Sequence, residues 1–212
     1  MGAWRGLLRA ATALDADAVT GLLTEAVAEA GVERTWDDLL RPALLELGNR
    51  WQTTGEAVEV EHLLSQIASS VLRTVRTDKD GVEGEQAGSL PIRPVVLLAA
   101  VDGEQHVLTL DALTALLTEH GDAVVSLGAS TPGAALDAVI RRLRPAAVFL
   151  WAPTERPSVT EIAAALRGWP PISTRRPLRI VVGGDGWRGV DLPPAVRRVG
   201  GLAEARAALV DV

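Results

Sequence analysis

The chain has 212 residues but contains no cysteine, no tyrosine, one phenylalanine and only three histidines. Without cysteine it can form no disulfide, no thiolate metal site, no cysteine nucleophile and no thioether link to a chromophore. The histidines stand far apart, at His62, His106 and His120, which leaves little for a metal centre built from several imidazoles. These absences remove most metal and nucleophile chemistry before any motif is considered.

Positive charge is also scarce, because 21 Lys and Arg residues stand against 27 Asp and Glu residues, giving a net charge of −6. Phosphate contacts dominate non-specific affinity for DNA, so we expect no direct nucleic-acid partner. No apolar run approaches the roughly 20 residues of a membrane-spanning helix. The N-terminal stretch carries Asp15 and Asp17 and no cleavage site, so we expect no signal peptide. The composition predicts a cytoplasmic protein without a membrane partner.

Helical periodicity governs residues 1–77, which we interpret as a four-helix bundle. Apolar residues such as Leu40, Leu44, Leu47 and Trp51 recur at steps of three and four, as an amphipathic helix requires. Short connections between such helices favour an antiparallel bundle. The expected helices cover about 3–13, from a cap at Asp15 or Asp17 to Gly31, 35–53 and 58–76. Residues 78–93 are rich in glycine and charge, which is typical of a linker.

Residues 94–212 alternate between apolar strands and helices, which predicts an α/β domain with a doubly wound parallel sheet. Ligands of such sheets bind beyond the carboxyl ends of the strands, where the strand order reverses. The expected strands are 94–100, 122–128, 146–152, 178–184 and a weaker one near 197–200. The expected helices are about 107–119, one after Pro132, 158–168 and 202–209.

The loop after the first strand combines Glu104 with His106, two residues later, at the predicted ligand-binding edge. One imidazole nitrogen can bind a metal while a carboxylate holds the other ring N–H. A lone histidine can serve as one axial ligand of a metal that a macrocycle already holds. The alternative is a solvated loop histidine. His120, at the end of the following helix, is interpreted as a surface residue favoured by the helix dipole.

Two further features carry weaker signals. Trp51 precedes a turn at Gly55, and Glu61 and His62 follow it, so an indole face lies near a carboxylate that can bind a flat polar ligand. The alternative is a bundle-core tryptophan beside a surface Glu-His pair. Gly183-Gly184 ends the fourth strand and permits close approach of the backbone to a bulky ligand, although any tight turn would use the same residues. No Lys-Ser/Thr pair follows, so a nucleoside-triphosphate loop is not expected.

Taken together, these features resemble a cobalamin-binding module, a helical bundle followed by a flavodoxin-like domain. The stretch from Glu104 to Thr109 resembles the family's Asp/Glu-x-His-x-x-Gly motif. The resemblance implies that His106 is the lower axial ligand of cobalt and that Glu104 modulates it. It also implies that the Gly183-Gly184 pair lines a channel for the nucleotide tail. Ser126 and Leu127, at the end of the second strand, complete the candidate cofactor contacts of this domain, with Thr109 and Trp151.

The spacing of nine residues between Trp51 and the Glu61-His62 pair resembles the CarH-type B12 photoreceptors. The resemblance implies that Trp51 packs over the adenosyl group of adenosylcobalamin, that Glu61 binds it through a hydrogen bond and that His62 lies nearby. It implies a light sensor and not an enzyme. Light would cleave the Co–C bond and change bundle packing, oligomerisation or partner binding. The implied partner is a protein effector or a second copy of the chain, as a dimer or tetramer.

The sequence departs from the family pattern at several positions. Thr109 replaces the motif's glycine, Trp151-Ala152-Pro153 replaces Ser-x-Leu/Thr after the third strand, and Gln52 replaces a histidine that can take the upper cobalt position after photolysis. The chain starts at the first bundle helix, so we expect a stand-alone module without the DNA-binding domain. This is also true of the photocobilins, and any biliverdin would bind here non-covalently. The open alternatives are a corrinoid carrier for a methyltransferase and a domain of this fold without cofactor.

Overall fold

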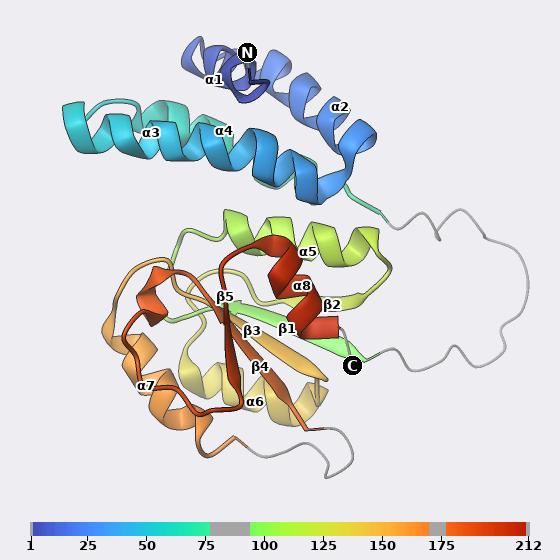
Figure 1. The fold of residues 1–212 in the computed structure, drawn as a ribbon, viewed down its shortest axis with the longest axis vertical. Helices are drawn as coiled ribbons and strands as arrows, with labels where there is room; N and C mark the ends of the chain where they lie inside the picture. Colours follow the sequence, from blue (N-terminus) through green and yellow to red (C-terminus); the bar gives the residue numbers. More distant parts are fainter. Residues whose placement is uncertain (1, 77–93, 170–176, 211–212) are drawn as a thin grey trace, which may run out of the picture. The chain divides into compact units, whose positions relative to one another are not determined.

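The structure is a computed structural model that describes residues 2–76, 94–169 and 177–210. The chain divides into two compact units between Val75 and Arg76 (Figure 1). The predicted linker, residues 78–93, lies outside the described residues. Across the part of the chain that is described, no helix combines the length and apolar character needed to cross a lipid bilayer.

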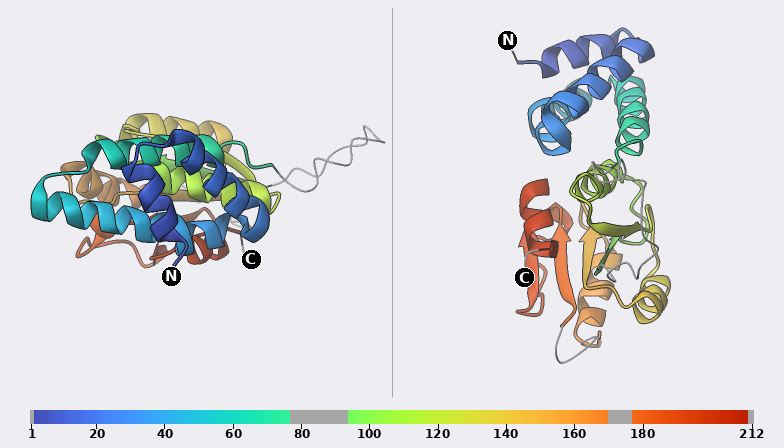
Figure 2. Two further views of the ribbon diagram at one scale, coloured as in Figure 1. Left: turned by 90° about the horizontal axis from the view of Figure 1, so that it is seen from above. Right: turned by 90° about the vertical axis from the view of Figure 1, so that its right-hand side faces the viewer.

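The first unit is helical, as predicted, and begins with α1 (Trp4–Thr12) and α2 (Ala16–Thr35) (Figure 2). The Asp15 side chain caps α2 by accepting a hydrogen bond of 3.0 Å from Ala18 N, as the sequence suggested. Gly31 has φ +78° and ψ 172°, so it interrupts the helix where the sequence predicted its end. The chain then continues through a π-helical turn, η1 (Trp36–Leu40), into α3 (Arg41–Thr54), and α4 spans Val58–Leu72.

The core of the helical unit consists of aliphatic residues contributed by every helix. Leu7, Leu23, Leu47 and Leu64 each have at most 1% of their surface exposed. Burying a leucine side chain contributes about 1.5–3 kcal/mol to folding. The burial of these leucines therefore accounts for the association of the four helices.

The second unit is a five-stranded parallel sheet with helices on both faces, which confirms the predicted fold class. The strands are β1 (Val95–Ala100), β2 (Ala123–Ser126), β3 (Ala147–Trp151), β4 (Arg179–Gly183) and β5 (Val196–Val199), in the order β2-β1-β3-β4-β5. The helices are α5 (Leu108–Glu119), α6 (Gly133–Leu143), α7 (Pro157–Leu166) and α8 (Leu202–Val210), with a 3-10 turn, η3, at Asp185–Trp187. In Figure 1, α5 and α8 cover one face and α6 and α7 the other.

The strand order reverses between β1 and β3, which are neighbours in the sheet although β2 separates them in the chain. Their parallel register pairs Ala100 with Trp151, and Trp151 in turn pairs with Gly183 of β4. The carboxyl ends of β1, β3 and β4 therefore lie side by side. The loop that carries His106 starts at this reversal point, where doubly wound sheets bind their ligands.

Candidate functional site

Glu104 and His106 are joined by hydrogen bonds in the loop between β1 and α5. Glu104 is fully buried, whereas 81% of the His106 side chain is exposed. Glu104 Oε1 lies 2.8 Å from His106 Nδ1 and accepts a hydrogen bond of 2.6 Å from the backbone N–H of His106. A carboxylate oxygen only accepts, so a neutral imidazole bonded to it carries its proton on Nδ1 and its lone pair on Nε2. The loop histidine is solvated, but its ring is held in one tautomer with Nε2 available.

Arg156, from the segment between β3 and α7, holds the other side of Glu104. Its Nη2 donates to Glu104 Oε2 at 2.7 Å, and its Nη1 donates to the carbonyl of Gly103 at 2.7 Å. Burying a carboxylate is costly unless it is paired and hydrogen-bonded. The guanidinium and the imidazole N–H together satisfy both oxygens of Glu104 inside the loop.

Two serines connect this loop to its neighbours. Ser130, after β2, donates from its hydroxyl to Asp102 Oδ1 at 2.9 Å and accepts from Gly103 N at 2.9 Å. Its own backbone N–H donates to the carbonyl of Glu104 at 2.8 Å. Ser158, in the first turn of α7, donates to the carbonyl of Asp102 at 2.8 Å. The loops after β1, β2 and β3 are therefore tied together at the carboxyl edge of the sheet.

Trp151, at the end of β3, also contacts the histidine loop. Its indole Nε1 donates to the carbonyl of His106 at 2.9 Å. Its ring stacks on Phe149, with centroids 6.5 Å apart and planes inclined by 19°. Trp151 therefore supports the backbone that carries His106, and its own ring is held in place by stacking on Phe149.

The glycine pair at the end of β4, Gly183 and Gly184, packs against neighbouring residues of β3 and the loop after it. A Cβ atom at Gly183 would lie 2.6 Å from Phe149 Cζ, and one at Gly184 would lie 2.2 Å from the carbonyl oxygen of Ala152. Gly184 also has φ +95°, a conformation that favours glycine. Close packing between the ends of β3 and β4 thus already accounts for both glycines.

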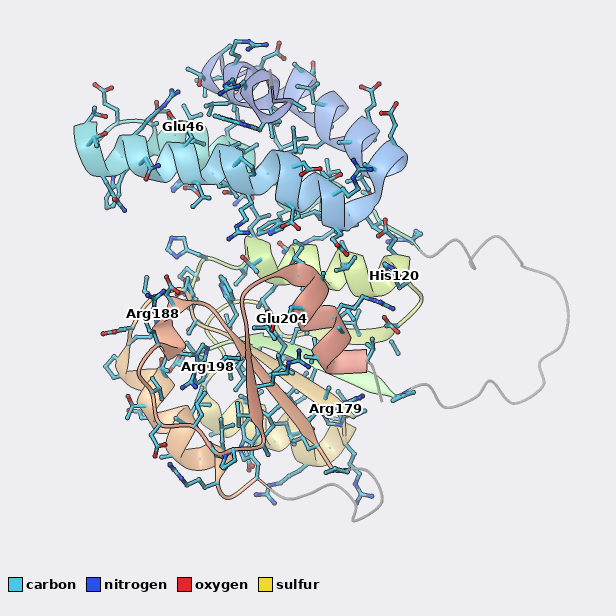
Figure 3. The ribbon with its side chains drawn as sticks, in the orientation of Figure 1. Glu46, His120, Arg179, Arg188, Arg198 and Glu204 are labelled. Carbon is cyan, nitrogen blue, oxygen red and sulfur yellow. The ribbon has the colours of Figure 1, made fainter. Side chains whose placement is uncertain are left out.

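The remaining candidate residues of this unit lie near the same edge. Thr109 is partly buried in the first turn of α5. Ser126 is the exposed last residue of β2, and Leu127 after it donates its backbone N–H to the carbonyl of Leu98 at 2.8 Å. His120 ends α5, where its Nδ1 lies 2.9 Å from the carbonyl of Leu116, away from this edge (Figure 3).

In the helical unit, Trp51, Glu61 and His62 flank the turn between α3 and α4. Trp51 is 57% exposed, so the alternative of a bundle-core tryptophan is wrong. Glu61, in the first turn of α4, accepts a hydrogen bond of 2.7 Å from the Ser65 hydroxyl, and His62 is largely exposed, with Nε2 3.8 Å from Glu61 Oε2. An exposed indole thus stands near the end of α3, and an anchored carboxylate near the start of α4.

Comparison with known proteins identifies proteins of similar sequence and similar fold. Residues 3–76 match the family described as "B12 binding domain". The chain is homologous to two Myxococcus xanthus proteins, the HTH-type transcriptional repressor CarA, at 36% identity over 181 residues, and the HTH-type transcriptional repressor CarH, at 29% over 143 residues. An alignment of 181 residues extends past the helical unit into the α/β unit.

Coverage differs between the chain and these relatives. The alignments cover 83% and 67% of this chain but only 56% and 45% of CarA and CarH, so the chain spans about half the length of the curated relatives it matches. Among solved structures, the Methanosarcina barkeri monomethylamine corrinoid protein superposes with a TM-score of 0.66 over 96% of this chain and 95% of that one. At 15% sequence identity this likeness shows a shared fold.

A B12-binding domain implies a corrinoid, and the donor chemistry at His106 fits one. A corrin ring supplies four nitrogen ligands to its cobalt, so a protein would need to add only a further donor. The oriented imidazole of His106, with Nδ1 bound to Glu104 and Nε2 exposed, would supply such a donor. At the end of β4, the Phe149 ring already occupies the space over Gly183, where an added Cβ would lie 2.6 Å from Phe149 Cζ.

Sequence reasoning missed Arg156 as a partner of Glu104 at this site. Arg156 is 52 residues from Glu104 in the chain, and its role depends on how the segment after β3 folds back. One signal was available. Arg156 follows a predicted strand, at the same sheet edge as Glu104.

Proposed function

We propose that this chain is the adenosylcobalamin-binding part of a light-responsive regulator, which acts by changing its own association or that of a protein partner. The observation that carries cobalt binding is the 2.8 Å contact between Glu104 Oε1 and His106 Nδ1, which leaves Nε2 exposed at the sheet edge. The B12-binding family and the homology to repressors named CarA and CarH support a regulatory role without catalysis.

In the α/β unit, His106 would hold the cobalt through Nε2. Glu104 would keep that nitrogen unprotonated by accepting the proton-bearing Nδ1. Arg156 would hold Glu104 in place, because it binds the second carboxylate oxygen and the backbone at Gly103. In this proposal His106 binds the metal, Glu104 orients His106, and Arg156 anchors Glu104.

In the helical unit, Trp51 and Glu61 would bind the adenosyl group. The exposed indole offers a flat apolar face to the adenine ring. Glu61 keeps an acceptor oxygen for the ribose hydroxyls, since Ser65 binds only its Oε1. His62 is exposed beside Glu61 and would contact the same group or replace it after illumination, given Gln52 in the place of the family's histidine.

When bound, adenosylcobalamin supplies a cobalt–carbon bond that green light breaks. Trp51 and Glu61 would then lose their contacts with the adenosyl group, and a difference in contacts between two states shifts their populations. We propose that the shift changes helix packing in the bundle and with it the formation of a dimer, a tetramer or a complex with an effector.

The test is to mix the full chain with adenosylcobalamin in the dark and follow absorbance and size-exclusion elution with light scattering before and after green light. We expect conversion of the spectrum and a change in molecular mass. Hydroxocobalamin is the control, because it lacks the cobalt–carbon bond. His106→Ala should remove the spectral signature of histidine ligation. An unchanged spectrum and an unchanged mass after illumination would refute light sensing.

A corrinoid carrier for a methyltransferase is the competing function. It predicts methyl transfer from methylcobalamin with a partner enzyme and no dependence on Trp51 or Glu61. A domain of this fold without cofactor predicts no change in absorbance on titration with any corrinoid. Biliverdin stays a prediction of the family resemblance, and its test is absorbance of the chain purified from bilin-producing cells.

A further inference from the structure

A groove between α1 and α3 of the helical unit has a volume of about 710 Å³. One wall is formed by residues of α1 that lie four apart, since such residues share a face of the helix. This wall contains Trp4, Arg5, Leu8 and Arg9, and the α3 wall contains Arg50 and Glu46, which is labelled in Figure 3. Tryptophan and arginine are among the residue types that most often dominate the energetics of protein interfaces. The composition of the groove therefore suits the binding of another protein surface.

The groove carries positive charge, although the chain as a whole has a net charge of −6. Glu46 Oε1 pairs with Arg50 Nε at 3.2 Å, so these two charges compensate each other. Arg5 lies over the Trp4 ring, 4.9 Å from its centroid. Within the described part of the chain, neither Arg5 nor Arg9 forms an ion pair, and α1 contains no acidic residue. Two exposed guanidinium groups therefore lie on the groove without a carboxylate partner.

The helix α2, which packs on α1, presents the opposite charge. It contains four acidic residues and one basic residue. Leu22, Glu25 and Glu29 follow one another at spacings of three and four, before the interruption at Gly31, so they lie on one face of the helix. Leu22 is 39% exposed, and both glutamates are exposed and form no ion pair among the residues that the structure describes. This face combines an apolar side chain with two uncompensated carboxylates.

From this complementarity we propose that the groove binds the α2 face of a second copy of the chain. The partner's Leu22 packs on Trp4, and the partner's two glutamates pair with Arg5 and Arg9. The two arginines, like the two glutamates, are four residues apart, about 6 Å along a helix, so the charges match in spacing. Because α1 packs on both α2 and α3, a twofold axis repeats the contact and closes a dimer. No candidate cofactor contact takes part, so this dimer goes beyond the proposed function and forms without cobalamin.

Sedimentation velocity of the full chain without cofactor tests the proposal. We expect a monomer–dimer equilibrium with a dissociation constant of about 10 μM, which weakens as salt screens the charges. Arg9→Glu should weaken the dimer about tenfold or more, because it brings like charges together. Arg41→Glu is the matched control, since Arg41 is exposed on α3 outside the groove and forms no ion pair within the described residues. Its dissociation constant should change by less than about threefold.

Exchange of the two charges separates this contact from any other. Arg5→Glu together with Arg9→Glu should weaken the dimer, and so should Glu25→Arg together with Glu29→Arg. A chain with all four substitutions has the two signs exchanged, so it should recover most of the lost affinity. Circular dichroism should show unchanged helix content in each variant, because all four side chains are exposed.

A chain that stays monomeric at about 100 μM would assign the groove to a different occupant and overturn the inference. A dimer that Arg9→Glu leaves intact, a dimer that forms only with adenosylcobalamin, or a chain with four substitutions that recovers nothing would overturn it as well. None of these results decides whether the chain binds cobalamin, which absorbance measures separately.

Discussion

Glu104 and Arg156 are joined by a hydrogen bond of 2.7 Å from Nη2 to Oε2, with Glu104 fully buried and the Arg156 side chain 24% exposed. Removing one partner of such a pair leaves a buried charge without compensation. We expect Arg156→Met to lower the free energy of unfolding by about 3 kcal/mol, the lower end of the range for buried pairs because Arg156 reaches solvent. Urea unfolding of the full chain, followed by circular dichroism, measures the change.

Arg188 supplies the matched control for that substitution. It lies just after the η3 turn, where it pairs with Asp185 at 2.8 Å and both side chains are 78% exposed (Figure 3). The hydrogen bond and the charge of Asp185 raise the pKa of Arg188, which stays charged throughout the working range of pH. Arg188→Met should leave stability nearly unchanged. Equal losses for the two variants would mean that Glu104 does not need its arginine.

Gly184 should tolerate no side chain. A Cβ atom there would lie 2.2 Å from the carbonyl oxygen of Ala152, and its φ of +95° is strained for any other residue. Gly184→Ala should therefore lower the free energy of unfolding by about 3 kcal/mol or more, because backbone strain and overpacking add together. Gly189 has φ +74° but open space around its Cβ position, so Gly189→Ala should cost only about 1–2 kcal/mol. Thermal unfolding of the two variants side by side separates the two contributions.

Two glycines in α2 should respond with opposite signs. Gly31, at φ +78° and ψ 172°, occupies a region that is essentially restricted to glycine, and Gly31→Ala should destabilise the chain by about 1–3 kcal/mol. Gly21 lies in the regular part of the helix with nothing near its Cβ position, so Gly21→Ala should stabilise it by about 0.5–1 kcal/mol. Chemical denaturation reports both. Stabilisation by both substitutions would place Gly31 in regular helix.

Trp51 and Trp36 test whether an exposed tryptophan serves binding. Trp51 is 57% exposed and Trp36 is 8% exposed. Trp51→Ala should change the free energy of unfolding by no more than about 0.5 kcal/mol. It should weaken the binding of adenosylcobalamin about tenfold relative to the binding of hydroxocobalamin, because the stacking contact is lost. Trp36→Ala should cost about 3–5 kcal/mol of stability. If Trp51→Ala binds both cobalamins as the wild type does, the assignment of Trp51 to the adenosyl group is wrong.

Sequence patterns located the secondary structure well, because burial in this fold leaves a strong local signature. The run expected as a strand at 146–152 forms β3 from Ala147 to Trp151, and the helix expected after Pro132 begins at Gly133. The fourth helix ends at Leu72 and not at residue 76. The π-helical turn at Trp36–Leu40 leaves no such signature, since it differs from α-helix only in hydrogen-bond register.

For the candidate site, the sequence located what lies within one loop and missed what crosses between loops. Glu104 and His106 are two residues apart, so their contact is a local property of the chain. The bond from Trp151 to His106 joins residues 45 apart. Trp151 was interpreted from the sequence as a departure from the family pattern. In the structure, its hydrogen bond supports the loop that carries His106. Such contacts depend on the tertiary fold, which spacing does not encode.

The bonds that join the loops after β1, β2 and β3 have a thermodynamic consequence for any ligand of His106. Ser130, Trp151, Arg156 and Ser158 already hold this backbone, so a ligand need not pay the entropy of ordering a loose segment, a cost of about 1–2 kcal/mol per residue. The loop is preorganised. The entropic saving would strengthen the binding of any ligand that contacts His106.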